Sequence, residues 1–356
     1  MKLHELLTAQ VQYQASDLIL KVNSPPIMRI NGDLQVTDLP QLTQIDIETG
    51  IIELLAKEQI EQYKKTHELD FSYEIPQGAR FRINLFKQKG NLGGVCRLIP
   101  SRVPTLDELG LPQHVKDMTL RPRGMIVVTG PSGCGKSTTQ AALLDHRNQN
   151  DTCHIVTVED PIEFIHLNKK ALVTQREVSK DTHSFANALK YVLRQDPDVI
   201  LVGEMRDLET IALAITAAET GHLVITTLHT SDAVSTIDRI IDVFPPHQQH
   251  QIRMQLSLNL VGIISQNLLK RADGKGRVAA YEILIALPAV RNLIREAKTH
   301  QISSILQTSQ QSGMISFDAC LANMVKNAVV TKEEAESKAL NQDTFHKEME
   351  SMTQSS

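Results

Sequence analysis

Hydrophobic and polar positions alternate in the first part of the chain. Residues 80–85, Arg-Phe-Arg-Ile-Asn-Leu, alternate strictly, which predicts a strand with one buried face and one polar face. Further strands are predicted at 17–20, 71–75 and 95–99, with breaks at 76–78 and 90–94, a hairpin at Asn31-Gly32, and helices at 3–11 and 43–65. These elements predict a small α+β domain over residues 1–100.

From residue 125 the pattern changes to short apolar runs that alternate with amphipathic segments, which predicts a parallel sheet. Strands are predicted at 125–129, 154–158, 199–202, 223–228 and 278–285, and helices at about 137–148, 183–195, 206–219, 232–242 and 288–298. The rest of the chain beyond 250 is predicted to be mostly helical, with a polar, frayed end at 341–356. The fold class is therefore α/β, with a separate α+β domain in front.

Composition narrows the class of protein. A chain of 356 residues predicts two domains, and its net charge of −4 gives little support to nucleic-acid binding as its main role. The four cysteines form no C-x-x-C pair, so neither a zinc site nor a disulfide framework is expected. The start lacks a signal peptide, and no apolar run approaches about 18 residues, so we expect a cytoplasmic protein without a transmembrane segment.

The segment 130–138, Gly-Pro-Ser-Gly-Cys-Gly-Lys-Ser-Thr, fits the phosphate-binding P-loop pattern and lies between a predicted strand and a predicted helix. Its backbone N–H groups would bind nucleotide phosphates, Lys136 would reach the β- and γ-phosphates, and Ser137 would bind Mg²⁺. The alternative is a glycine-rich turn with a chance lysine. The predicted ligands are ATP and Mg²⁺, and the predicted binding residues of the loop are Ser132, Gly133, Cys134, Gly135, Lys136, Ser137 and Thr138.

Acidic residues follow two of the predicted strands, at the sheet edge where ligands bind. Glu159, Asp160 and Glu163 follow one strand, and Glu204 follows another, directly after Gly203. Such carboxylates can orient an attacking water or hold Mg²⁺ through its hydration shell. Any one of them alone could instead be a helix cap or a surface charge.

His222 and His229 lie at opposite ends of one predicted strand, roughly 23 Å apart. His229 at the carboxyl end is the better candidate for sensing the γ-phosphate. His222 is expected to be structural or to reach a different site, such as one in a neighbouring subunit. A core or capping role is the alternative for both.

Two other features have both a structural and a functional interpretation. Arg80 and Arg82 share the polar face of their strand, which is either a solvated surface or a pair of phosphate ligands offered across a domain or subunit boundary. Cys134 adjoins the anion-binding loop and Lys136, which predicts a reactive thiolate; the alternative is a small residue that fills the loop.

Five ordered motifs resemble those of the PilT/PilU family, the retraction ATPases of bacterial type IV pili within the secretion-ATPase superfamily. They are the P-loop, an Asp box at 159–164, a Walker B segment at 203–210, a His box at 217–230, and Ala-Val-Arg-Asn-Leu-Ile-Arg-Glu at 289–296. The resemblance covers about residues 3–330.

The resemblance implies a PAS-like domain at 1–100, a linker at 101–122, a RecA-like ATPase domain at 123–290 and a C-terminal helical region at 291–356. It implies a homohexamer that binds ATP between the two domains, with Glu163 as general base and Glu204 as the Walker B carboxylate. Arginines matching Arg80, Arg82 and Arg97 would approach the phosphates. The ring would dock on an inner-membrane platform protein and power pilus retraction and twitching motility.

Departures from the family pattern, including Ile19, Ser132 and Cys134, leave the exact paralogue open, and there are two alternatives to the motor. One is a PilU-like accessory ATPase that binds the main motor, with a paralogous ATPase as its partner. The other is a DNA-handling RecA-type ATPase, which the acidic balance and the absence of tryptophan disfavour.

Overall fold

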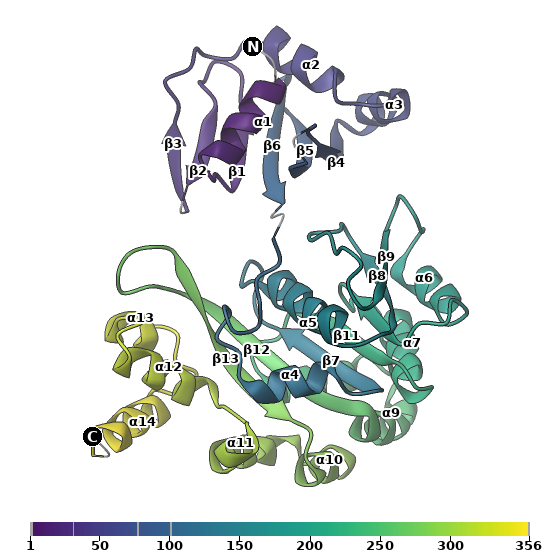
Figure 1. The fold of residues 1–356 in the computed structure, drawn as a ribbon, viewed down its shortest axis with the longest axis vertical. Coiled ribbons are helices and arrows are strands. Elements are labelled where there is room, and N and C mark those ends of the chain that lie inside the picture. Colours follow the sequence, from purple (N-terminus) through teal and green to yellow (C-terminus); the bar gives the residue numbers. More distant parts are fainter. Residues whose placement is uncertain (1–2, 31, 77, 100–101, 355–356) are drawn as a thin grey trace. The chain divides into compact units, whose positions relative to one another are not determined.

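The computed structural model describes residues 3–30, 32–76, 78–99 and 102–354. The chain divides into two compact units, Met1–Arg102 and Val103–Ser356 (Figure 1). The predictions that touch Asn31, Gln77, Pro100, Ser101 and the last two residues lie outside the described residues. No helix in the described ranges is long and apolar enough to cross a membrane.

The first unit is a six-stranded antiparallel sheet with the strand order β3-β2-β1-β6-β5-β4. Its elements are α1 (Leu3–Gln12), β1 (Asp17–Leu20), β2 (Ile27–Ile30), β3 (Asp33–Val36), α2 (Gln44–Ile52), α3 (Lys57–Thr66), β4 (Glu68–Glu74), β5 (Arg80–Gln88) and β6 (Asn91–Ile99). The alternation in β5 has the predicted effect, because Phe81, Ile83 and Leu85 are fully buried. The leucines of α1 pack into the same core.

The predicted break at residues 90–94 is wrong in part, because β6 already begins at Asn91. Gly93 lies in the strand opposite Phe86, and a Cβ at this position would lie 2.8 Å from the Phe86 ring. The glycine therefore provides space for an aromatic neighbour within the sheet and does not end the strand.

The second unit is built on a seven-stranded sheet with the order β13-β12-β7-β11-β10-β8-β9. Its elements up to the last strand are α4 (Gln113–Thr119), β7 (Gly124–Thr129), α5 (Lys136–Asn150), β8 (His154–Glu159), β9 (Leu172–Glu177), α6 (Phe185–Val192), β10 (Val199–Val202), α7 (Leu208–Glu219), β11 (Leu223–Leu228), α8 (Ala233–Asp242), α9 (Pro246–Asn259), β12 (Leu260–Lys270) and β13 (Arg277–Ile285). All pairs are parallel except β12 with β13.

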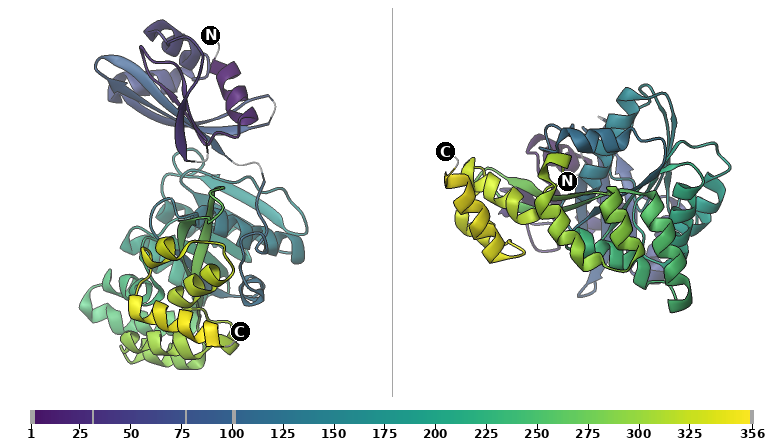
Figure 2. Two further views of the ribbon diagram at one scale, coloured as in Figure 1. Left: turned by 90° about the vertical axis from the view of Figure 1, so that its left-hand side faces the viewer. Right: turned by 90° about the horizontal axis from the view of Figure 1, so that it is seen from below.

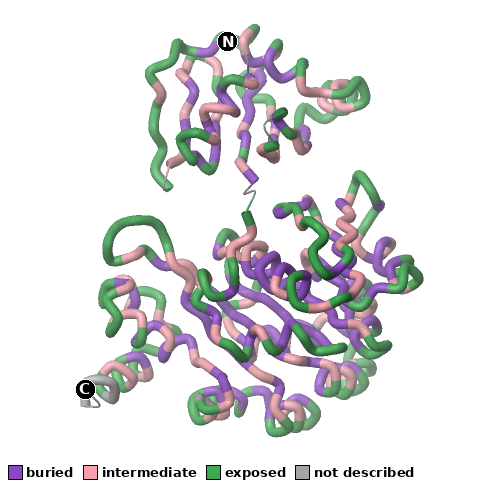
Figure 3. Tube along the Cα trace, in the orientation of Figure 1, coloured by how far each residue is buried: buried purple, intermediate pink, exposed green. Residues whose placement is uncertain are grey.

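The central strand β7 is buried on both faces of this sheet (Figure 3). Met125 and Val127 pack with the helices α6–α10, whereas Ile126 and Val128 pack with α4 and α5. The sheet is thus the middle layer of a three-layer α/β unit, as expected for parallel strands with continuous apolar runs.

The structure corrects several sequence-based predictions in this unit. The strands β9 and β12 were not predicted, and residues 260–270 form the longest strand of the sheet instead of a helix. The helix predicted at 288–298 is shorter, as α10 (Pro288–Arg295). The helix predicted at 206–219 begins two residues later, as α7, where Leu208 is exposed.

The C-terminal segment also differs from the prediction. Residues 341–356 were expected to be frayed, but α14 (Gln342–Gln354) packs against α12 (Phe317–Lys326), as Figure 2 shows for the yellow helices. The short elements η1 (Thr299–Gln301), α11 (Ile302–Thr308), η2 (Gln310–Ser312) and α13 (Lys332–Glu336) complete this region. Phe345 is fully buried in a cluster with Leu321, Ala335 and Leu269 of β12. Through this side chain, α14 packs against the same apolar cluster as the end of β12.

Phe345→Ala is expected to destabilise the C-terminal helices by about 3–5 kcal/mol, because it leaves a cavity in this small cluster. Native-state hydrogen exchange of α12 and α14 measures the change. Leu340→Ala, at a residue 52% exposed, is the control and should change exchange little. Unchanged protection in Phe345→Ala would show that α14 contributes no stability there.

Candidate functional site

The P-loop connects the carboxyl end of β7 to the start of α5. Gly130 has a φ of +142°, and a Cβ there would lie 2.2 Å from the Gln266 carbonyl oxygen and 2.7 Å from Cys134 Sγ. Gly135 caps α5 with a φ of +92°, and no side chain caps this helix. The first-turn N–H groups of α5 therefore lack a side-chain cap, as an anion-binding helix start requires.

The other predicted residues of the loop differ in exposure. Ser132 and Gly133 are exposed, whereas Ser137 and Thr138 are half-buried in the first turn of α5. The exposed and half-buried positions of the loop are therefore accessible to a bound phosphate, as expected for a P-loop.

The Lys136 ammonium lies inside the loop. Its Nζ donates to the carbonyl oxygens of Gly130 and Pro131, at 2.8 and 3.0 Å. Burial lowers the pKa of Lys136, and the negative charges of Glu204 and Glu163 act in the opposite direction.

His229 connects Lys136 to Glu204. Its Nδ1 lies 3.3 Å from Lys136 Nζ, and its Nε2 lies 3.0 Å from Glu204 Oε1. A lysine ammonium can only donate, so Nδ1 accepts and the ring proton is on Nε2, which donates to the carboxylate. The three side chains form one polar chain that reaches the P-loop.

Glu204 follows β10 and also binds Arg206, whose Nη2 lies 2.8 Å from Glu204 Oε2. Burial alone would raise the pKa of Glu204, but the hydrogen bonds and charges of Arg206 and His229 hold it below its ordinary value. The carboxylate is therefore ionised near neutral pH. The Gly203 backbone has little room beside it, since a Cβ there would lie 3.3 Å from the Val158 carbonyl oxygen.

The carboxylates after β8 lie in two environments. Glu159 is half-buried and accepts from Thr157 Oγ1 at 2.7 Å and from Gln175 Nε2 at 3.1 Å. Desolvation raises its pKa to about 6. Glu163 is exposed, and its charge acts on Lys136. An exposed carboxylate is free to approach a water molecule at the loop, whereas Glu159 is held by its partners.

The structure places His222 away from the loop, at the amino end of β11. Its Nδ1 lies 2.9 Å from the Ala217 carbonyl oxygen, so the ring binds the last turn of α7. Within one subunit His222 acts as a helix cap, and it does not join Lys136, Glu204 and His229.

Arg80, Arg82 and Arg97 lie on one face of the sheet in the first unit, where Arg82 is directly opposite Arg97. Arg97 Nε donates to Asp17 Oδ1 at 2.9 Å, and Arg82 Nε lies 3.8 Å from Asp70 Oδ1. The polar face predicted from the alternation is therefore a network of charges, with Asp17 as its buried member.

Comparisons with known proteins show the family of the chain. The type II/IV secretion system protein family matches residues 2–337. The chain belongs to this family. The chain is 49% identical to the type IV pilus retraction ATPase PilT of Pseudomonas aeruginosa, in an alignment that covers 97% of this chain and all of PilT. It is 40% identical to the type IV pilus ATPase PilU of the same species, in an alignment that covers 94% of this chain and 88% of PilU. A crystal structure of the pilus retraction motor PilT with bound ADP superposes with a TM-score of 0.91, at 43% identity, and covers 98% of this chain and 99% of the other.

The chain is thus a PilT-type ATPase with an α/β fold, and its recognition from five motifs is confirmed. Two structural features of this ATPase were not predicted. Gln266 of β12 is buried against the P-loop: its Nε2 donates to the Cys134 carbonyl oxygen at 2.7 Å, and its Oε1 accepts from Thr139 Oγ1 at 2.8 Å. Arg206 is the second partner of Glu204. Only a correct prediction of β12 would have pointed to Gln266.

The structure corrects the prediction for Cys134. Its side chain is buried, and burial raises the pKa of the thiol although Lys136 acts in the opposite direction. The thiolate is therefore disfavoured at neutral pH. The role of a small residue that fills the loop beneath Gly130 fits the structure better.

Gln266→Leu removes both hydrogen bonds to the P-loop at nearly constant volume and is expected to lower kcat/KM for ATP by about tenfold or more. Steady-state ATP hydrolysis measures the effect. Gln248→Leu, at an exposed residue of α9, is the control. Wild-type kcat/KM in Gln266→Leu would show that Gln266 does not position the loop.

Cys134 is expected to react with iodoacetamide more slowly at pH 7 than an unstructured cysteine, because burial raises its pKa and blocks access. Mass spectrometry of time points at pH 7 and pH 9 measures the rate, and cysteine in the urea-unfolded chain provides the reference. Rapid labelling of the native protein at pH 7 would contradict this expectation.

Proposed function

We propose that this chain is the motor ATPase that powers type IV pilus retraction and twitching motility. The observation that carries the proposal is the polar chain Lys136–His229–Glu204 at the P-loop, in a protein 49% identical to a retraction ATPase. Phosphoryl transfer needs mainly positioned charge and a positioned water, and this arrangement can supply both.

Each residue near the loop has a role in this proposal. Backbone N–H groups at 132–138 hold the phosphates and Lys136 neutralises the β- and γ-phosphate charge. Glu163 acts as general base on the attacking water. His229 contacts the γ-phosphate and, through its hydrogen bond to Glu204, couples the bound phosphate to the position of that carboxylate.

The residues at the loop also suit Mg²⁺. Ser137 and Glu204 would hold the ion, partly through water, and the ion would neutralise charge on the phosphates. Mg²⁺ usually keeps several waters and binds one or two carboxylates, which is compatible with a Glu204 that already accepts from Arg206 and His229.

The proposal extends to assembly. A homohexamer would bring Arg80, Arg82 and Arg97 to nucleotide phosphates, and His222 to the site of a neighbouring subunit. The division would be a PAS-like domain at 1–100, a linker at 101–122, a RecA-like ATPase domain at 123–290 and a helical region at 291–356. The ring would act in the cytoplasm on an inner-membrane platform protein.

The second candidate, a PilU-like accessory ATPase that binds a paralogue, is supported by the 40% identity to PilU.

Lys136→Ala and Glu204→Gln are expected to lower ATP turnover at least about 100-fold, because each removes a charge that acts on the transferring phosphoryl group. A coupled phosphate-release assay measures turnover. Glu209→Gln, an exposed carboxylate paired with Lys190, is the matched control. Full turnover in either site variant would contradict the assignment of the site.

The same Glu204→Gln variant, expressed in place of the chromosomal copy, separates the two candidates. A motor should lose twitching on agar and retraction in a tethered-bead assay. An accessory ATPase should retain both, as long as the variant still binds its paralogue in a pull-down.

A further inference from the structure

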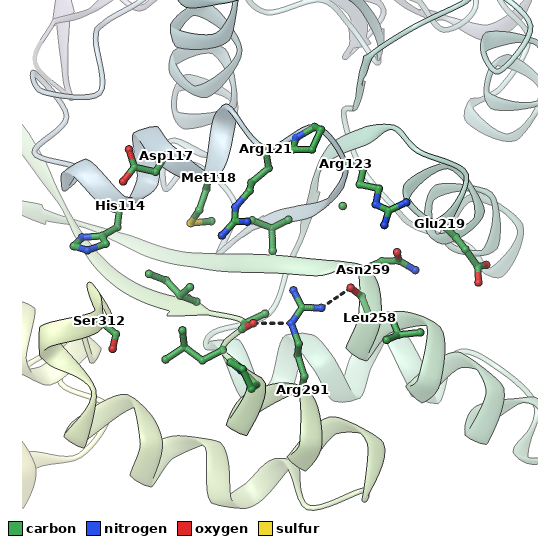
Figure 4. A pocket seen from close by; sticks show the side chains of 17 residues that line it. His114, Asp117, Met118, Arg121, Arg123, Glu219, Leu258, Asn259, Arg291 and Ser312 are labelled. Carbon is green, nitrogen blue, oxygen red and sulfur yellow. Dashed lines mark hydrogen bonds between the residues drawn. The ribbon is translucent and has the colours of Figure 1, made fainter.

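A second cavity, of about 800 Å³, lies in the ATPase unit at the opposite end of β7 from the P-loop (Figure 4). It adjoins Gly124, the first residue of β7, and is enclosed by the segment between α4 and β7, the α9–β12 junction and the start of α10. We call it the arginine pocket, after Arg121, Arg123 and Arg291 in its lining.

Arg121 and Arg123 provide available donors. Both are exposed, and within the described residues neither side chain has a hydrogen bond or ion pair. Figure 4 shows the two guanidinium groups and that of Arg291 around the same space. Three arginines against the carboxylates of Asp117 and Glu219 leave the lining with an excess of positive charge.

Arg291 has a different role. Its Nε donates to the Ala286 carbonyl oxygen at 2.8 Å, and its Nη atoms donate to the carbonyl oxygens of Ser257, Leu258 and Leu260. It thereby satisfies carbonyl groups at the end of α9 that would otherwise repel an anion. Burial, followed by the positive charges of Arg121 and Arg295, lowers the pKa of Arg291.

Two acidic residues in the lining carry negative charge, but their hydrogen-bond partners lie elsewhere. Asp117 accepts from Gln113 Nε2 at 3.0 Å, and Glu219 accepts from Gln255 Nε2 at 2.7 Å. Neither forms an ion pair with Arg121 or Arg123 among the described residues. The guanidinium groups therefore remain available to a ligand.

The rest of the lining is apolar and includes Met118, Val261, Ile285 and Leu287. Small-molecule sites commonly combine about 300–1,000 Å³ of volume with an apolar wall and a few charged groups. Guanidinium forks match phosphate oxygens in pairs, and an apolar wall can accept a base or another flat group.

We propose that the arginine pocket binds a phosphate-bearing small molecule of nucleotide size, at a second site separate from the P-loop. Arg121 and Arg123 bind the phosphate, and Met118, Val261 and Leu287 contact the body of the ligand. A concave, partly apolar site of this volume favours a small molecule over an acidic protein surface.

The test is isothermal titration calorimetry on the full chain, with ADP at saturating concentration to fill the P-loop. Sodium pyrophosphate and GMP are titrated separately. Binding is expected, and each of Arg121→Ala and Arg123→Ala should weaken it about tenfold, with about 100-fold for the double variant. Stronger binding of GMP than of pyrophosphate supports a ligand of nucleotide size that contacts the apolar wall, whereas binding of pyrophosphate alone would overturn that part of the proposal.

Arg194→Ala/Arg277→Ala is the control, because it removes two exposed arginines elsewhere and gives the same net charge. It should leave binding unchanged, and circular dichroism checks that all variants are folded. Equal binding by the two double variants would overturn the proposal. The proposal would also be overturned if neither phosphate compound bound, or if polyglutamate bound and the phosphate compounds did not. Loss of binding in Lys136→Ala would overturn it as well, because that result would assign the ligand to the P-loop.

Discussion

The register of β7 between β11 and β12 determines the geometry of the phosphate site. Thr129, the last residue of β7, is paired with Leu228 on one side and with Ser265 on the other. The residues that come next, Gly130 after β7, His229 after β11 and Gln266 within β12, therefore lie at the same level of the sheet. A slip of one residue in either pairing would turn the following side chains to the opposite face of the sheet.

Some contacts at this edge determine the conformation of the P-loop, and others determine the ionisation of its carboxylate. Gln266 fixes the shape of the loop through two hydrogen bonds, and its backbone comes so close to Gly130 that no other residue fits there. His229 and Arg206 fix the charge, because they keep Glu204 ionised and connect it to Lys136. The opposite end of the same strand borders the arginine pocket, so β7 runs from the P-loop to this cavity.

The sequence was informative where the local pattern and the tertiary environment agree. The runs before Gly130 and at 199–202 and 223–228 are mostly apolar and β-branched because their strands are buried on both faces. β9 is an edge strand with mixed polar residues, and β12 follows α9 without a turn signal, so neither pattern was recognisable. Phe345 lies in a mostly polar tail, and the cluster that it joins explains the ordered helix.

The P-loop, the order of the motifs around it and the type of ATPase could all be identified from the amino-acid sequence. Each is recognised by residue types at fixed short spacings, which need no knowledge of tertiary contacts. The tertiary structure decided which distant side chains meet. It brought Gln266 to the loop and raised the pKa of Cys134 by burial. Those outcomes depend on strand register and desolvation, which arise from contacts between residues far apart in the chain and leave no local pattern.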